Sequence, residues 1–306
     1  MNYPLVSVVI PTYCRPVFLQ RCVNSVLNQT YASIEVLVVD DNNPNTEARK
    51  ETEKVMQAFI NNPKVNYLQH DKNRNGSAAR NTGWKASKGK YITFLDDDDE
   101  IAKNKIEKQV DCLESLDESW GMCYTGYKLI KEHGENQISS EKHRGDCYIN
   151  ALMRTMFMGS GSNLLLRKNV VDMIGGYDES FIRNQDVEFL ARACENYKLA
   201  YVDEILLTIH QEGNRASRTF DQLDEFSRFY LKKFKERIRM LNVKDQERVI
   251  AVISLERCRN AFYHRKFSAG IRILRENKVG LFYRVKYVVY LLNRAITHKS
   301  YGFDGN

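Results

Sequence analysis

YITFLDDDDE, residues 91–100, joins a short apolar segment to five consecutive acidic residues. Its first five residues are β-branched, aromatic or apolar, the composition of a strand buried on both faces. The four aspartates repel one another, and each raises the pKa of the next. A compact fold accommodates such a run best beside a cation, and a hard divalent ion shares oxygen ligands with a substrate phosphate. The stretch therefore indicates a metal-bound diphosphate; the alternative is an acidic turn that caps a helix beginning near Ala102.

Buried strands alternate with helices through the first third of the chain. The β-branched runs LVSVVI (residues 5–10) and IEVLVV (residues 34–39) and a short segment at residues 65–68 predict three strands before the one at residue 91. Apolar residues at helical spacing predict a helix over residues 16–29. Helices are also predicted over residues 47–61 and over residues 76–87, a segment rich in small side chains. This alternation predicts βαβ units and a mostly parallel sheet flanked by helices, an α/β fold of the Rossmann-like type.

Polar residues follow three of these strands directly. Pro11-Thr12-Tyr13 ends the first strand, Asp40-Asp41 the second, and Asp96–Asp99 the third. Ligands of such sheets bind beyond the carboxyl ends of the strands, so we expect these groups to meet at one edge. Taken alone, Asp41 has an equally simple interpretation as an acidic residue of a turn.

The later part of the chain contains further predicted elements. These are strands over residues 121–130, 160–166 and 205–209 and helices over residues 103–116, 168–174 and 186–196. From Asp221 the pattern is helical almost to the end. We therefore predict an α/β domain over residues 1–220 and a helical C-terminal region over residues 221–306.

Composition excludes several classes of protein. The 306 residues are 43% hydrophobic and 28% charged, and no apolar run approaches the length of a membrane-spanning helix. The N-terminus has no basic segment before its apolar run, so it does not resemble a signal peptide. The seven scattered cysteines contain no CxxC pair, which fits a reducing compartment. We expect a cytoplasmic protein.

The positive charge is concentrated at the C-terminus. Residues 228–306 hold 19 Lys and Arg against 6 Asp and Glu, whereas residues 1–227 hold 27 against 33. Residues 226–240 and 279–296 also carry apolar positions at helical spacing, a pattern typical of helices on anionic membranes. Peripheral contact with the inner face of the plasma membrane is one interpretation, and a helical appendage packed on the catalytic domain or on a second subunit of a homodimer is the other. No nucleic-acid-binding motif accompanies the charge.

Five ordered segments carry a resemblance to a known family. They are VSVVIPTYCR, SVLNQTYASIEVLVVDDNNP, NRNGSAARNTGWKASKGKYITFLDDDD, GGYDESFIRNQDVEFLAR and IHQEGNRAS. This series, across roughly residues 4–212, resembles the family 2 glycosyltransferases, which have the GT-A fold. The resemblance implies an inverting glycosyltransferase that uses a nucleotide-sugar, with UDP-sugars favoured over dTDP- or GDP-sugars, and Mn²⁺ or Mg²⁺.

The resemblance also implies roles for individual residues. Asp41 would bind the uracil ring, Asp96 would face the nucleoside, and Asp98 would ligate the metal ion. Asp186 would be the catalytic base, although its place before a helix also suits a cap. His210 would be a further metal ligand, unless it is an ordinary polar residue at a strand end. The remaining predicted nucleotide-sugar-binding residues are Pro11, Thr12, Tyr13, Arg15, Gly76, Arg80 and Asp97.

Two positions depart from the family pattern. Gln185 stands where the family usually has Glu, so a charge beside Asp186 is missing. Asp97 stands where the family often has a small residue, which leaves the metal ligand open between Asp97 and Asp98.

The chemistry of glycosyl transfer fits this set of residues. A divalent ion can stabilise the departing diphosphate, and a carboxylate can accept the proton of the attacking hydroxyl. The expected acceptor is a glycan or a lipid-linked saccharide of bacterial cell-surface polysaccharide assembly. Alternative functions are a non-catalytic module that binds sugar-nucleotides or glycans, and a nucleotidyltransferase, which would release pyrophosphate.

Overall fold

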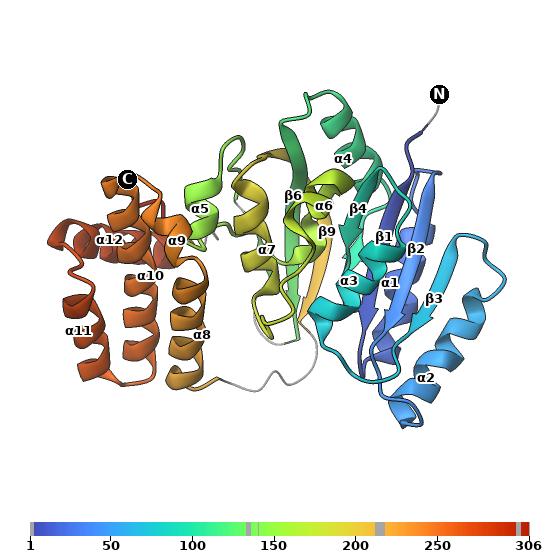
Figure 1. The fold of residues 1–306 in the computed structure, drawn as a ribbon, viewed down its shortest axis with the longest axis horizontal. Helices are drawn as coiled ribbons and strands as arrows, with labels where there is room; N and C mark the ends of the chain where they lie inside the picture. Colours follow the sequence, from blue (N-terminus) through green and yellow to red (C-terminus); the bar gives the residue numbers. More distant parts are fainter. Residues whose placement is uncertain (1–2, 133–135, 140, 212–217, 298–300, 306) are drawn as a thin grey trace. The chain divides into compact units, whose positions relative to one another are not determined.

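The computed structural model describes residues 3–132, 136–139, 141–211, 218–297 and 301–305. Within this part of the chain, the residues divide into two compact units (Figure 1).

The first unit is α/β and the second is helical. Residues 1–147 and 158–212 form the α/β unit, and residues 148–157 and 213–306 form the helical unit. The segment 148–157, with helix α5 (Tyr148–Leu152), therefore groups with the C-terminal helices. That residues 1–220 and 221–306 are independent domains stays a prediction.

A mixed nine-stranded sheet forms the centre of the α/β unit in the described residues. The strands are β1 (Val6–Thr12), β2 (Ile34–Asp40), β3 (Val65–Gln69), β4 (Tyr91–Phe94), β5 (Glu100–Ile101), β6 (Trp120–Lys131), β7 (Gln137–Ile138), β8 (Leu165–Arg167) and β9 (Lys198–Gln211). Their order is β3-β2-β1-β4-β8-β6-β9-β5, with β7 paired to β6. The long ladders are parallel and the antiparallel ones are short, so the predicted mostly parallel α/β fold is confirmed.

Helices cover both faces of this sheet (Figure 1). They are α1 (Pro16–Leu27), α2 (Glu47–Met56), α3 (Gly76–Ala86), α4 (Lys105–Glu114), α6 (Lys168–Ile174) and α7 (Gln185–Cys194), with 3₁₀ turns η1 (Gln57–Phe59) and η2 (Gly161–Asn163).

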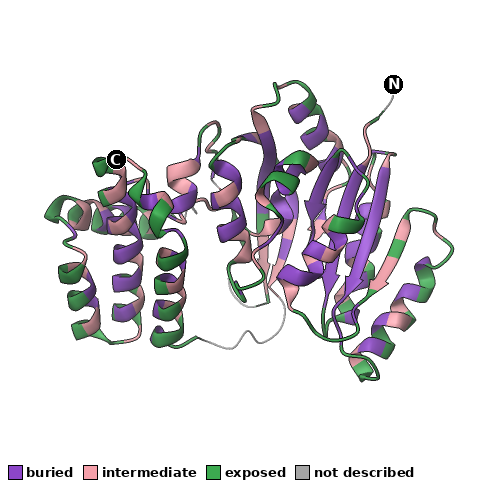
Figure 2. Cartoon of the chain, viewed as in Figure 1, coloured by how far each residue is buried: buried purple, intermediate pink, exposed green. Residues whose placement is uncertain are grey.

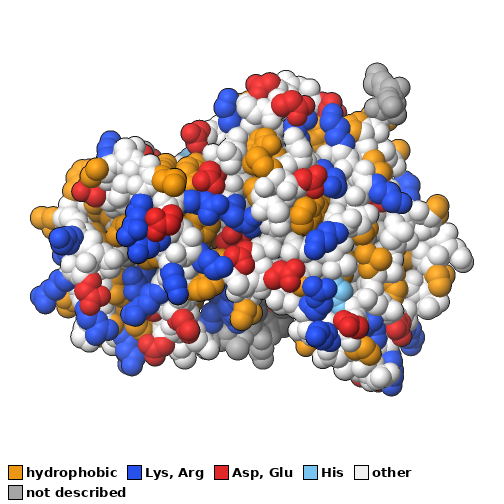
Figure 3. Space-filling view, in the orientation of Figure 1, with side chains coloured by type: hydrophobic (Ala, Val, Ile, Leu, Met, Phe, Trp, Pro, Cys, Tyr) orange, Lys and Arg blue, Asp and Glu red, His pale blue; other side chains and the backbone are white. Residues whose placement is uncertain are grey.

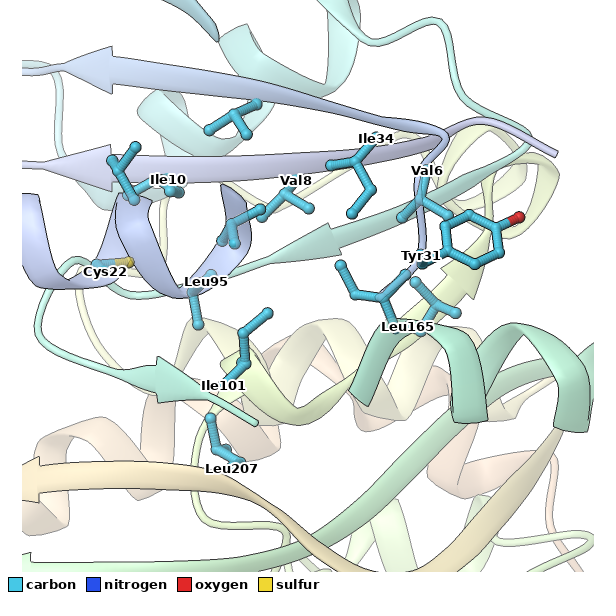
Figure 4. Packing of buried hydrophobic residues seen from close by; sticks show 14 of the residues in the cluster. Val6, Val8, Ile10, Cys22, Tyr31, Ile34, Leu95, Ile101, Leu165 and Leu207 are labelled. Atoms are coloured by element: carbon cyan, nitrogen blue, oxygen red, sulfur yellow. The ribbon is translucent and has the colours of Figure 1, made fainter. Parts of the chain in front are cut away.

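Alternate residues of β1 point to opposite sides of the sheet. Val6, Val8 and Ile10 pack in one hydrophobic cluster with residues of α1 and α4 (Figure 4). Val9 faces the other side and meets Gly83 of α3. Because both faces are covered, the central strands are buried along their length (Figure 2), as their continuous apolar sequence predicts.

One predicted strand is largely wrong. Residues 161–163 form the 3₁₀ turn η2, and only residues 165–167 form a strand. The Ser160 hydroxyl accepts a hydrogen bond from the Ser162 amide, and the Asn163 amide donates to two backbone carbonyls. Side-chain bonds to the backbone compete with sheet pairing, and those of Asn163 reach both the nearby Met158 and Thr125 of β6, which explains the turn.

The last predicted strand of the sheet is longer than expected. β9 begins at Lys198 because it pairs in parallel with most of β6. The two-residue strand β5 also pairs with β9, so helix α4 begins at Lys105 and the acidic run does not lead directly into a helix.

The second unit contains α5 and the helices α8 (Phe220–Lys233), α9 (Lys235–Arg239), α10 (Val243–Tyr263), α11 (Phe267–Glu276) and α12 (Leu281–Thr297). Stacked Tyr230 and Phe234 are buried in it, and the Arg257 guanidinium donates to Asp224 across 2.7 Å in its interior. Among the described helices, none is both long and apolar enough to cross a membrane.

Helix α3 approaches β1 closely because residue 83 has no side chain. A Cβ at Gly83 would lie 2.2 Å from Val9 Cγ1. Gly83→Ala gains at most about 1 kcal/mol of helix propensity, whereas overpacking costs about 1–3 kcal/mol or more. We expect a net loss of unfolding free energy of about 1–2 kcal/mol, measured by urea denaturation. Gly280→Ala is the control, because its Cβ would meet no atom within 4 Å; equal stability of the two variants would contradict this packing.

Candidate functional site

A polar cavity opens at the carboxyl ends of the neighbouring strands β2, β1 and β4. Its volume is about 260 Å³. It is lined by Pro11, Thr12, Tyr13, Arg15, Asp41, Asn73, Asn75, Gly76, Ala79, Arg80 and Asp96. Eight of these residues belong to the predicted nucleotide-sugar site, so the structure brings most of that set together in one cavity. Asp97, Asp98, Asp186 and His210 do not line it.

Asp41 organises the loop that follows β3. Its buried carboxylate accepts hydrogen bonds from His70 Nδ1 at 2.7 Å, Asn73 Nδ2 at 2.9 Å and the Arg74 amide at 2.8 Å. A carboxylate only accepts, so His70 carries its proton on Nδ1, and its Nε2 lies 2.8 Å from the Thr82 hydroxyl. Asp41 is therefore more than a turn residue, because it fixes one wall of the cavity.

Asp96 and Arg80 form an ion pair at the floor of the same cavity. The Asp96 amide lies 3.0 Å from the Ser162 hydroxyl, which ties the end of β4 to the turn η2. The Arg80 guanidinium also lies over the Tyr177 ring, 5.4 Å from its centroid. Gly76 leaves room for it, since a Cβ there would lie 2.9 Å from Arg80 Nη1.

Arg15 holds the next two aspartates. Its guanidinium pairs with Asp97 at 2.6 Å and with Asp98. Burial raises the pKa of Asp97 to about 7, against the opposing charge of Arg15. Arg21 of α1 adds a hydrogen bond to the backbone carbonyl of Asp98 at 3.0 Å. Together with Arg80 of α3, these cations at the start of α1 compensate one acidic run from two helices.

The last aspartate of the run lies in the interior. Asp99 accepts a hydrogen bond from the Ser160 hydroxyl at 3.0 Å, and burial raises the pKa of Asp99 to about 8. Nearby, the buried Lys105 ammonium donates to Gln109 at 2.8 Å and to the Ser162 carbonyl at 3.3 Å. Burial lowers the pKa of Lys105 to about 7.

Asp186 lies in the first turn of α7, beside the cavity residues. Burial raises its pKa, the charge of Asp96 raises it further, and Arg80 opposes both. Its neighbour Gln185 accepts a hydrogen bond from Arg80 Nη1 at 3.3 Å. The N-cap position of the helix is Asn184, and the Asp186 carboxylate accepts a hydrogen bond from the backbone amide of Val187 in the first turn at 3.0 Å.

His210 lies near the end of β9, outside the cavity lining. Its Nε2 is 3.4 Å from a carboxylate oxygen of Glu100 on the paired strand β5. Among the described residues, no cluster of three or more His, Cys, Asp or Glu side chains is arranged to hold a metal ion by itself.

The acidic run nevertheless suits a shared metal ion. Mg²⁺ commonly binds through one or two carboxylates, with substrate phosphates and waters as the other ligands. Within the described part of the chain, the charge of the buried Asp97 carboxylate is compensated only in part, by the ion pair with Arg15 and the nearby Thr12 hydroxyl. Carboxylate oxygens whose negative charge is not fully compensated are suitable ligands for a hard divalent cation.

This sheet topology, with a cavity at its carboxyl edge, is that of the GT-A fold. The structure of Staphylococcus aureus TarS 1-349 in complex with UDP-GlcNAc is similar, with a TM-score of 0.64 and 18% identity, over 85% of this chain and 73% of that one. The mannosyltransferase PcManGT from Pyrobaculum calidifontis, in complex with GDP-Man and Mn²⁺, has a TM-score of 0.59 and 14% identity, over 90% and 76% of the two chains.

Residues 7–175, more than half of the chain, match Glycosyl transferase family 2, and the protein belongs to this family and is a glycosyltransferase. The uncharacterized glycosyltransferase RP339 of Rickettsia prowazekii is 27% identical over 303 residues, which cover 95% of this chain and 92% of that protein. Three other Rickettsia relatives are longer, and the match spans between 29% and 37% of their length.

Some site residues were given no role from the sequence. Asn73 and Asn75 begin the NRNG segment that carries the family resemblance, but no function was predicted for them, and His70, directly after β3, matches no motif. A polar cluster after a third parallel strand could have drawn attention to them, because that strand ends at the same edge of the sheet.

The Asp41 network predicts a stability effect. In Asp41→Asn, the amide NH₂ would face a hydrogen-bond donor, and one buried partner would lose its acceptor. We expect a loss of about 1–3 kcal/mol of unfolding free energy, measured by chemical denaturation without ligand. Asp71→Asn, an exposed aspartate of the same loop, is the control and should change it by less than about 0.5 kcal/mol. An unchanged midpoint for Asp41→Asn would mean that the network does not stabilise the loop.

Proposed function

We propose that the protein transfers a sugar from a nucleotide-sugar, with UDP-sugars favoured, to an acceptor hydroxyl by a single inverting displacement. The observation that carries the proposal is the position of Arg80. It pairs with Asp96 in the cavity and reaches Gln185, the neighbour of Asp186. The nucleotide side and the base side of the reaction are thus linked through one cation.

The cavity would hold the nucleoside. Pro11, Thr12 and Tyr13 at the end of β1 would contact the base and ribose. A carboxylate has about four acceptor positions, and three protein donors already use Asp41, which leaves one for an N–H of the base. A uracil N3–H is a donor of this kind.

The diphosphate would lie toward the cations. Arg15 and Arg80 both line the cavity and can pair with phosphate oxygens. Asp98, with Asp97 as the alternative ligand, would hold Mn²⁺ or Mg²⁺, and we retain His210 as a proposed further ligand. When bound, such an ion stabilises the negative charge that develops on the leaving diphosphate.

Asp186 would act as the general base. A positioned carboxylate accepts the proton of the acceptor hydroxyl as that oxygen attacks the anomeric carbon. The raised pKa of Asp186 makes it a stronger base than an exposed aspartate. The nearness of Asp186 to Asp96 and Arg80 supports a position beside the donor. In the proposed in-line displacement, the acceptor hydroxyl would attack from the side opposite the leaving diphosphate.

The proposed donor is supported by the ligands of similar structures, and the proposed acceptor by the charge of the C-terminal region. TarS binds UDP-GlcNAc, which favours uracil and an N-acetylhexosamine, whereas PcManGT binds GDP-Man with Mn²⁺, so guanine donors belong in any screen. The proposed acceptor is a glycan or a lipid-linked saccharide of bacterial cell-surface assembly. This part of the proposal rests on the basic C-terminal region alone.

A donor screen that follows nucleoside-diphosphate release, with and without Mn²⁺, tests the reaction. Asp186→Asn removes the base and should lower kcat by roughly 10²–10⁴-fold, while nucleotide binding is retained. Asp98→Asn should lower turnover and also weaken metal-dependent nucleotide binding. Glu195→Gln, at the exposed end of the same helix as Asp186, is the matched control.

Three outcomes would contradict the proposal. Full activity of Asp186→Asn would remove the general base. Binding without turnover of any donor by the native chain would favour the non-catalytic module. Release of pyrophosphate would favour a nucleotidyltransferase.

The environment of Asp186 predicts a pH dependence. The base must be ionised, so kcat/KM should fall as the pH falls through its raised pKa. Gln185→Glu adds a neighbouring negative charge and raises the pKa of Asp186. The acidic limb of the pH profile of kcat/KM should therefore move to higher pH by about 0.5–1 unit. Gln185→Met, similar in size and neutral, is the control. A limb at the same pH in both variants would mean that Asp186 does not set it.

A further inference from the structure

Helix α12 exposes a continuous apolar face. Seven large apolar residues of this helix are each between 54% and 77% exposed. They are Leu281, Phe282, Val285, Val288, Val289, Leu292 and Ile296. Their spacing of three, four and seven residues places them on one side of the helix over its whole length. Contiguous apolar surface of this kind marks an interaction site.

The opposite side of α12 fixes its orientation within the helical unit. Tyr287 and Tyr290 are buried and pack against Phe303 at centroid distances of 5.1 and 5.2 Å. The Tyr290 hydroxyl donates to the Tyr301 carbonyl at 2.7 Å. Because this side is anchored, the apolar side cannot turn inward without breaking these contacts.

The surrounding charge is almost entirely positive. Residues 257–297 contain ten Lys and Arg and a single acidic residue, Glu276. Helix α12 itself carries Arg284, Lys286 and Arg294 and no acid. Lys and Arg side chains are spread over the C-terminal helices on the face drawn in Figure 3.

A groove beside the start of α12 is also lined by apolar and positively charged side chains. It has a volume of about 760 Å³ and is lined by Val279 and Gly280 of the α11–α12 junction and by Tyr283 of α12. Four exposed cations also line it, against one carboxylate, Glu247. These cations are Lys232, Lys235, Arg239 and Lys278.

The two basic segments predicted to be amphipathic, residues 226–240 and residues 279–296, differ in whether their apolar sides are buried. In residues 226–240, the apolar side chains of Tyr230, Phe234 and Ile238 are buried within the helical unit. That segment therefore uses its apolar face for its own core. Among the two segments, only α12 presents such a face outward.

We propose that α12 docks the protein on a bilayer surface that contains anionic lipids. Its apolar face would lie at the boundary between headgroups and acyl chains, and the flanking Lys and Arg would contact lipid phosphates. A second copy of the chain is the less favoured occupant, because two such surfaces would bring like charges together. The proposal is independent of the reaction, since docking requires neither donor nor acceptor.

Flotation of the full chain with lipid vesicles tests this inference. Vesicles of phosphatidylcholine with about one third phosphatidylglycerol should bind the protein, and pure phosphatidylcholine should bind it at least about tenfold less. The triple variant Val285→Gln, Val288→Gln, Val289→Gln should reduce binding to anionic vesicles by about tenfold or more. These positions are exposed and Gln favours helices more than Val does, so the fold should be retained.

The matched control replaces three exposed apolar residues elsewhere, Ile60→Gln, Met240→Gln and Val243→Gln. It should bind within about twofold of the native chain, because these residues lie outside α12. Equal binding by the α12 variant and the native chain would overturn the proposal, as would a native chain that does not bind anionic vesicles. A native dimer that the α12 variant dissociates, without vesicle binding, would assign the face to a second copy instead.

Discussion

The α/β unit depends on neutralising a run of carboxylates at the end of a buried strand. Charges taken out of water are costly unless they are paired and hydrogen-bonded. Arg15, immediately before α1, pairs with Asp97 and Asp98, and Arg80, in α3, pairs with Asp96. These ion pairs connect helices on opposite faces of the sheet to the end of β4. The geometry of the cavity therefore follows from the compensation of charge as much as from apolar packing.

The same groups suit the proposed chemistry. Arg15 and Arg80 pair with the protein's own carboxylates, and they line the cavity where the proposed diphosphate would lie. A divalent ion and a diphosphate that bind together bring both signs of charge. The arginines could then pair with the diphosphate and the aspartates with the ion, and no buried charge would be left unpaired. Gln185 offers Arg80 only a neutral amide oxygen, so it does not compete with the carboxylate of Asp96 for the charge of this cation.

The helical unit has an opposite imbalance, with surplus positive charge and apolar surface. Some of its acids are held in buried or part-buried pairs, such as Asp224 with Arg257 and Glu256 with Arg154. What is left on α12 is an apolar face between cations, a combination that water solvates poorly and an anionic bilayer surface solvates well. A transferase with a lipid-linked acceptor would benefit from such a helix, which connects this surface to the proposed function.

The sequence by itself determined the parallel strands β1, β2 and β4 and the gathering of their polar ends, because continuous β-branched runs can only be buried in a covered sheet. It also determined the family, because an ordered series of motifs is specific where a single motif is not. Only the tertiary structure decided that Ser160–Asn163 turn away from a strand, that His70 supports Asp41, and that Arg15 binds two aspartates 82 and 83 residues along the chain. It also decided which basic helix keeps its apolar face exposed. These outcomes depend on partners distant in sequence, and burial and pairing between such partners leave no periodic pattern in the chain.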